Sequence, residues 1–506
     1  MRLSFARMLL WVCGAFIALF AVEFFLEWWR LGRPGVEALS WNGVNNAKLV
    51  DVLSPMARAY NNILAMLIAT IGLAIPLTAN MHTPKLIDMF LRDRLNQAML
   101  LLIAFGAANV LFVAYIIGPE FAPMWAFRFA IGFALLGWAL LIPYFFYVVR
   151  FLDPSNILAR LEAETRRILD HVASGKNHHE KAQHEVHERL FQIGTVVLKS
   201  LDRSDRGVAL EGVWTLKKLI DYYGALKPRM PGPWFVIDRS DFVGLSPEAL
   251  ELLNEERTWF EMKAMTQVLF AYQAALSKTS DVVSSVSDAV RVIGLAAHQR
   301  GDSPMLGLCI RVFNNFMREG IKRKDVHSMY DVLYEYRLLA RDLEDVPDRQ
   351  REIARHMRFY AASARAGGVP FIQHLAAFEL GYIVRRAYEE GGEAARELLD
   401  HALAIPHREG DARIPMVVKA KLKLGGFFVQ RGLPTEAKVV ADDLADVPAS
   451  ELRAAEHELL SAERSFFEVT DRQENLDYLK PERRAPTQRF VADLCARKES
   501  PAPAAA

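Results

Sequence analysis

The chain has 506 residues, 52% of them hydrophobic, and its 61 lysines and arginines nearly balance its 60 aspartates and glutamates. This length allows two or three domains, and the lack of net basic charge gives nucleic-acid binding no electrostatic support. The three cysteines, Cys13, Cys309 and Cys495, are too scattered for a disulfide framework or a metal knuckle. We therefore expect reduced thiols, no cofactor, no metal and no nucleic-acid partner.

Four apolar segments are long enough to cross a lipid bilayer, which takes about 20 mainly apolar residues per helix. They cover residues 8–29, 59–79, 98–117 and 124–149. The first is too long for a signal-peptide core, ends in FFLEWW without a small-residue cleavage pattern, and precedes three more spans. We expect it to be retained, so residues 1–152 are predicted to form a four-helix transmembrane bundle.

The basic residues that flank the spans predict their direction, because Lys and Arg are retained on the cytoplasmic side. Seven of them fall on one side of the predicted bundle: Arg2, Arg7, Lys85, Arg92, Arg94, Arg150 and Arg160. On the other side, GPEFAP between spans three and four has no basic residue, although the longer loop at residues 30–58 has four. The balance predicts that both termini lie in the cytoplasm, and makes FLRDRLNQ, residues 90–97, a cytoplasmic turn.

Two stretches around this turn carry a family resemblance. IPLTANMHTPKLIDMFLRDRLNQ (75–97) and LIPYFFYVVRFLDPSNILARLEAE (141–164) are similar to a bacterial family of predicted membrane proteins, known as domain of unknown function twenty-two fifty-four. The turn residues concerned are Pro84, Lys85, Leu86, Phe90, Leu91, Arg92, Asp93, Asn96 and Gln97, with Arg94 beside them. The exit-helix residues are Asn156 to Arg160, after Asp153. The resemblance implies membrane spans joined to a cytosolic domain, and no known activity.

Two charged residues lie inside the predicted spans, Glu23 in span one and Arg128 in span four. A lone charge at the centre of a membrane helix costs ~2.5–3.5 kcal/mol on insertion scales, so such charges usually pair or line water. We predict an ion pair between Glu23 and Arg128. The alternative is that Arg128 snorkels outward and Glu23 sits among lipid headgroups beside Trp28 and Trp29.

The segment after the fourth span is predicted to be helical almost to its end. Asp153 before Pro154 is an N-cap and first-turn signal. We expect a stalk and first cytosolic helices at residues 153–222, a Pro-rich loop at 223–247, a helical-repeat domain at 248–496 and a disordered tail at 497–506. Trp234 and Phe235 make the loop a candidate for docking to a partner, a second subunit or the membrane, the alternative being that they pack on their own domain.

Three stretches of the repeat domain share a loose pattern, residues 310–333, 379–403 and 423–444. Each places aromatic residues before a Gly-containing turn, at Gly320, Gly392 and Gly432, and a second amphipathic helix follows. The pattern resembles tetratricopeptide-type hairpins and predicts an all-α fold with a degenerate α-solenoid. An ordinary helical bundle is the alternative.

The sequence contains no motif that predicts catalysis. NHHEKAQHEVHERL holds His178, His179, His184 and His187, but no two histidines have the four-residue spacing of zinc hydrolases of the His-Glu-x-x-His type. We interpret this stretch as a solvated helix start. The alternative is a weak metal site, in which His184 and His187 share a helix face with Glu180 or Glu188.

We therefore expect a non-enzymatic role for the protein. We expect a membrane protein that presents a cytosolic helical surface to a protein partner, as a scaffold, sensor or assembly factor. The alternative is a homo-oligomeric ion channel or small-solute transporter gated by the cytosolic helices. Polar residues in spans two and three fit helix packing under either hypothesis: Asn61, Asn62, Thr70, Thr78 and Asn109.

Overall fold

The computed structural model of the protein describes residues 46–499, apart from gaps at 82, 84–85, 118–122, 176–178, 238–241, 243, 277, 410–411 and 466–474, together with scattered positions between 14 and 29. Within these residues the chain is almost entirely helical, which confirms the predicted all-α class. The exception is a pair of two-residue antiparallel strands, β1 (Arg408–Glu409) and β2 (Ala412–Arg413). The chain divides into two compact units, residues 1–160 (unit 1) and 161–506 (unit 2).

Unit 1 contains three helices that, among the described residues, are long and apolar enough to cross a membrane. They are α2 (Asn46–Met81), α4 (Arg94–Ile116) and α5 (Met124–Leu152), with the short α3 (Leu86–Arg92) between the first two. They correspond to the predicted spans 59–79, 98–117 and 124–149, although α2 begins well before residue 59. Half of the predicted span 8–29 lies outside the described residues, and the positions described between 14 and 29 are helical.

Unit 1 has several small side chains at its helix contacts and many large apolar side chains on its outer surface. The buried side of α5 includes Ala126, Ala130, Ala134 and Gly137. Large apolar side chains on the outside are more than half exposed: Met66 at 71%, Leu73 at 73%, Ile142 at 64% and Phe146 at 66%. Small residues let helix backbones approach closely where no hydrophobic effect drives association. This distribution agrees with a lipid environment.

The three helices meet at Tyr60. This α2 side chain is 1% exposed and lies against Gly106 of α4 and Gly137 of α5. A Cβ atom at Gly106 would lie 2.9 Å from the Tyr60 hydroxyl oxygen, and one at Gly137 would lie 2.7 Å from the Tyr60 ring. Real Cβ atoms essentially never come that close, so both positions require glycine as long as the tyrosine stays there.

We expect Gly137→Ala to destabilise the full-length protein by roughly 1–3 kcal/mol, because the added methyl group overpacks the Tyr60 site. The matched control is Gly132→Ala on the same helix, where a Cβ atom would meet nothing within 4 Å. That control should be neutral or stabilising, since alanine is favoured over glycine in a helix by about 1 kcal/mol. Thermal unfolding in detergent measures both, and equal melting temperatures would contradict this packing.

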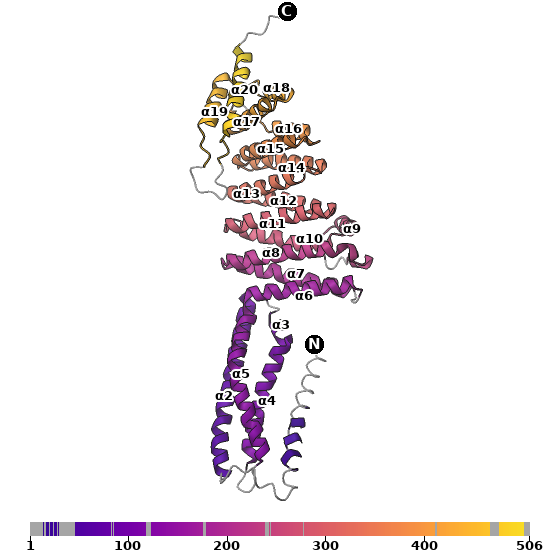
Figure 1. Ribbon diagram of the computed structural model, residues 1–506, viewed down its shortest axis with the longest axis vertical. Coiled ribbons are helices and arrows are strands. Elements are labelled where there is room, and N and C mark those ends of the chain that lie inside the picture. The colour runs from indigo at the N-terminus through magenta and orange to yellow at the C-terminus, as the bar shows by residue number, and fades with distance from the viewer. Residues whose placement is uncertain are drawn as a thin grey trace, which may run out of the picture. The chain divides into compact units, whose positions relative to one another are not determined.

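Unit 2 is a succession of helices in chain order (Figure 1). It begins within α6 (Pro154–Ala173). The helices that follow are α7 (His179–Asp202), α8 (Arg206–Leu226), the 3-10 helices η2 (Lys227–Arg229) and η3 (Gly232–Phe235), α9 (Pro247–Glu256), α10 (Trp259–Ala275), α11 (Ser280–Gln299), α12 (Ser303–Arg323), α13 (Val326–Asp342), α14 (Pro347–Ala366), α15 (Phe371–Glu390), α16 (Ala395–Leu403), α17 (Pro415–Arg431), α18 (Pro434–Asp443), α19 (Ala449–Ser461) and α20 (Pro481–Glu499). The last of these continues past residue 497, where the tail was predicted to begin.

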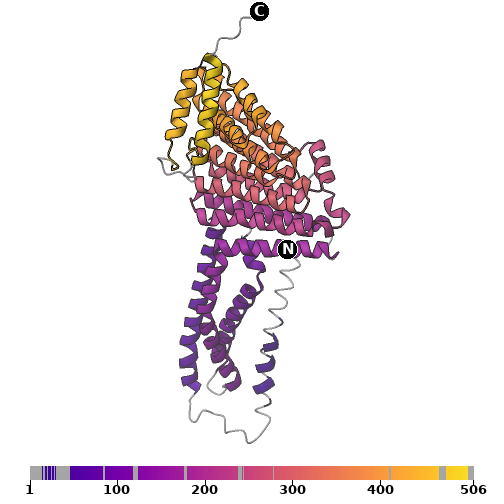
Figure 2. The ribbon, with the colours of Figure 1, turned by 45° about the horizontal axis from the view of Figure 1, so that its top comes forward.

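The helices of unit 2 form two ladders. In the first, α8, α11, α13, α15 and α17 each pack on the next. In the second, α7, α10, α12, α14 and α16 do the same, and the pairs α10/α11, α12/α13 and α14/α15 join the two ladders. Stacked aromatic rings fill the space between neighbours, for example Tyr272 on Phe316 with centroids 4.0 Å apart and Phe313 on Tyr336 at 4.8 Å. Helices α17 to α20 close the C-terminal end of the stack (Figure 2).

The predicted turn glycines are right at one position of three. Gly432 ends α17 with a φ of 67°. At the end of α15 the left-handed residue is Gly391, with a φ of 69°, and not Gly392. Gly320 is wrong, because it lies buried inside α12, where it makes room for Met329, and Lys324 ends that helix with a φ of 55°. A glycine that serves close packing cannot be told from a turn glycine by spacing alone.

Candidate functional site

The turn that carries the family resemblance joins α3 to α4, and its polar side chains close it. The Asp93 carboxylate caps α4 by accepting two backbone N–H groups of the first turn, at 3.0 and 3.1 Å. The side-chain amides of Asn96 and Gln97 donate to the carbonyl oxygens of Phe90 and Leu91, at 3.3 and 2.7 Å. Nearly every polar group in this stretch thus has a local structural role.

The same turn contacts the end of α5. The Tyr147 hydroxyl donates to Asp93 Oδ1 at 2.8 Å. The Phe90 ring packs edge-on against Phe151, with centroids 5.4 Å apart, and the Arg160 guanidinium lies 4.0 Å from the Phe151 ring centre. The two stretches that resemble the family therefore form one cluster. The predictions did not single out Tyr147 and Phe151, although both lie within the stretch 141–164.

The exit residues cap the junction between α5 and α6. Asp153 accepts the backbone N–H of Ser155 at 3.1 Å. Asn156 donates to Asp153 Oδ2 at 3.1 Å and to the carbonyl oxygen of Arg150 at 3.0 Å. These contacts account for the residue types without any chemistry on a substrate. Of the remaining turn residues, Arg92 and Arg94 are exposed, and Pro84 and Lys85 lie outside the described residues.

We expect Asp93 and Tyr147 to be coupled in a double-mutant cycle. Tyr147→Phe should cost about 1–3 kcal/mol of stability, because it removes a hydrogen bond to a carboxylate. In an Asp93→Ala background the same change should cost nearly nothing. Thermal or denaturant unfolding of the detergent-solubilised protein measures the coupling.

Tyr115→Phe is the control for this cycle, since the Tyr115 side chain is 89% exposed on α4. It should leave stability unchanged in both backgrounds. Additive losses from Asp93→Ala and Tyr147→Phe would show that the contact contributes nothing.

Glu23 forms a hydrogen bond with a side chain of α4. Its Oε1 atom accepts a hydrogen bond of 2.8 Å from the Asn109 amide, and both side chains are buried. Glu27, one turn away, accepts the backbone N–H of Trp125 at 3.2 Å, and the Arg128 guanidinium lies 5.2 Å from the Trp125 ring centre. The Glu23–Arg128 ion pair stays a prediction. The Asn109 contact was missed, because hydropathy does not say which polar groups of different spans face each other.

The residues proposed for docking hold the loop to unit 2. Trp234 is 0% exposed, its ring packs 4.9 Å from that of Trp259, and its Nε1 donates to the Tyr223 hydroxyl at 3.1 Å. The Trp234 carbonyl accepts hydrogen bonds of 2.8 Å from Gln183 and from Trp259. Phe235 is buried as well. A docking role for this pair is therefore wrong, because the domain core already covers both side chains.

The histidine stretch contains no metal-binding arrangement within the part of the chain that the structure describes. His184 faces Glu188 at 3.7 Å, and His187 Nε2 lies 3.3 Å from the Lys263 amine. His178 lies outside the described residues.

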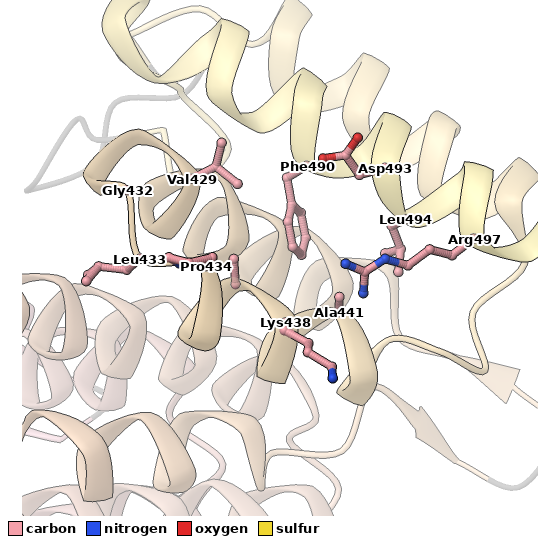
Figure 3. Close-up of a pocket in the computed structure, with 11 residues that line it drawn as sticks. Val429, Gly432, Leu433, Pro434, Lys438, Ala441, Phe490, Asp493, Leu494 and Arg497 are labelled. Atoms are coloured by element: carbon pink, nitrogen blue, oxygen red, sulfur yellow. The ribbon is translucent and has the colours of Figure 1, made fainter.

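A cavity of about 410 Å³ lies between α17, α18 and α20 (Figure 3). Phe490 and Leu494 of α20 face Pro434 and Ala441 across it. The charged side chains at its edge are Lys438, Asp493 and Arg497. The mixture is mainly apolar and brings no nucleophile and base together.

Residues 2–199 match the model of a family described as "Predicted membrane protein (DUF2254)". The family resemblance is confirmed over these residues. The match extends through unit 1 and most of α7, and the family that it concerns has no assigned activity. The three apolar helices of unit 1 are consistent with membrane association.

The other comparisons add little. No curated protein matches the chain. Among solved structures, a "Circular tandem repeat protein with novel repeat topology and enhanced subunit contact surfaces" is 13% identical, with 90% of this chain and 97% of that chain covered. Its TM-score of 0.32 is too low to support a shared fold.

Proposed function

We propose that the protein is a multi-pass protein of the bacterial inner membrane whose unit 2 offers a helical surface to cytosolic protein partners, as a scaffold, sensor or assembly factor. The observation that carries this proposal is the pair of helix ladders from α7 to α17. In a degenerate α-solenoid of tetratricopeptide-like hairpins, each pair buries its apolar face against its neighbours, and the outer face of a ladder stays available for binding.

Exposed aromatic residues favour the second ladder as that surface. Phe191 of α7, Phe270 of α10 and Phe359 of α14 are 58%, 42% and 60% exposed. Aromatic side chains are enriched at protein interfaces relative to the rest of the surface. Their recurrence on helices of one ladder supports a binding face there.

Charge supports the proposed orientation. Arg92 and Arg94 are exposed at the turn between α3 and α4, as expected for residues that hold a turn on the cytoplasmic side. With an even number of spans, unit 2 and both termini then lie in the cytoplasm.

A photoreactive amino acid placed at Phe270 or Phe359 of the full-length protein should give, on irradiation of intact cells, the same discrete adduct with a cytosolic protein. Lys218 is the control position, because it is exposed on α8 of the other ladder. Gel shift and mass spectrometry identify the adduct. No adduct at either phenylalanine, or the same products at all three positions, would contradict the proposal.

The second candidate is a homo-oligomeric ion channel or small-solute transporter, and the Glu23–Asn109 contact favours it. An ionisable residue buried in a membrane bundle is often part of a transport pathway. Under this hypothesis, liposomes that contain the purified protein should pass ions or solutes, and Glu23→Gln should abolish the flux while Gly132→Ala does not. Liposomes of the unaltered protein that pass nothing would remove this candidate.

A further inference from the structure

A second cavity in unit 2, of about 540 Å³, is lined mainly by cationic side chains. It lies among α15, α17, the segment at residues 475–480 and the first turn of α20. The cations that line it are Arg385, Arg386, Lys423, Arg464, Lys480 and Arg483.

One carboxylate, Glu389, also lines the cavity. It lies 3.3 Å from Arg483, 3.4 Å from Arg386 and 3.9 Å from Arg431, and Arg386 lies 2.7 Å from Glu390 as well. Lys423 donates to the backbone carbonyl oxygens of Leu476 and Tyr478 at 2.6 and 2.8 Å. Six cations and one carboxylate are thus among the described residues that line the cavity.

Arg385 lies near two other arginines, Arg337 and Arg483, and near Glu389. The Arg337 guanidinium nearby is paired with Glu379 at 2.8 Å, whereas Arg385 forms no ion pair within the described part of the chain. Burial, and then the neighbouring Arg483, lower the pKa of the Arg385 guanidinium to about 10, so it still carries its charge at neutral pH. Arg385 is partly exposed, and the part of a cation that is withdrawn from water is costly to place unless an anion accompanies it.

Other partly buried cations of unit 2 lie beside carboxylates. Lys227 lies 2.8 Å from Glu261 and 2.9 Å from Asp302. Arg291 lies 2.6 Å from Glu335 and also contacts Asp288. Arg385 differs from these two, because it forms no ion pair with a residue that the structure describes.

We propose that this cavity binds a small, multiply charged phosphate-bearing anion, with Arg385 and Arg483 as its principal ligands. Planar guanidinium groups suit the oxygens of phosphate, to which they donate paired hydrogen bonds. The volume falls within the roughly 300–1,000 Å³ of small-molecule sites. Tyr382 and Tyr478 add aromatic surface for the organic part of a phosphate ester. The proposal does not depend on the interaction role argued above.

The test is ligand binding by the purified full-length protein in detergent. Pyrophosphate, ATP and a short-chain phosphatidylglycerol are the phosphate probes, and citrate is the anion without phosphate. A ligand that binds the folded state raises the melting temperature. We expect at least one phosphate probe to do so and citrate not to. A response to pyrophosphate or ATP identifies a soluble phosphate compound, and a response to the lipid alone identifies a headgroup.

Arg385→Gln should weaken calorimetric binding of the responding probe by at least about tenfold, because it removes charge-assisted hydrogen bonds. Arg396→Gln is the control, since Arg396 is half exposed on α16 and faces Asp400 at 3.5 Å. Without ligand, Arg385→Gln should leave the melting temperature unchanged or higher, because it relieves repulsion with Arg483. A purely structural arginine would instead lower it.

The proposal is overturned if no phosphate probe binds, if citrate binds equally well, or if Arg385→Gln binds as the unaltered protein does. Should that variant fail to fold, Lys480→Gln replaces it, because Lys480 is exposed and its loss leaves the packing intact. It should then weaken binding in the same direction.

Discussion

Close approach of apolar helices at small side chains is the constraint on which unit 1 depends. In lipid, acyl chains are as apolar as leucine, so burial of large side chains between helices gains little. Attraction must come from many short-range contacts, and these need backbones near each other. Gly106 and Gly137 make room for the Tyr60 ring, which brings α2, α4 and α5 together at one point. Large apolar side chains such as Leu73 and Phe146 remain exposed on the outer surface.

Polar contacts between helices determine which helix faces lie against each other in this packing. Asp93 with Tyr147 ties the turn to α5, and Glu23 with Asn109 ties the first segment to α4. Each contact gives a hydrogen-bond partner to polar groups that would otherwise be costly to place away from water. Unit 2 works in the opposite way, because in water the large side chains go inside. Stacked aromatic pairs such as Tyr272 with Phe316 join neighbouring helices of unit 2. The turn that carries the family resemblance belongs to unit 1.

The sequence predicts those helices whose length the thickness of a bilayer determines. Residues 98–117 and 124–149 were predicted as spans and closely match α4 and α5, because an apolar run of that length has few other uses. The early start of α2 was missed, since Lys48 and Asp51 lower the local hydropathy. Yet Leu49, Leu53 and Ala57 are buried at four-residue spacing, which is the signal of an amphipathic helix that a span-length average hides. The Glu23–Asn109 contact and the Arg385 cavity depend on residues brought together by folding, so no local pattern predicts them.

The cationic cavity shows how far overall charge can differ from local charge. The whole chain carries a formal net charge of +1, from which no anion site would be predicted. Within unit 2, lysine and arginine side chains usually lie next to carboxylates. Asp446 lies 2.8 Å from His407, 2.6 Å from Arg413 and 3.3 Å from Arg408, and hydrogen bonds from Arg413 and His407 hold the pKa of its carboxyl well below the usual range despite some burial. That cluster is complete, because the carboxylate accepts donors on both oxygens. At the Arg385 cavity the described residues that line the wall include six cations and one carboxylate, and in our proposal an anion from solution completes the cluster in the way that Asp446 completes the other.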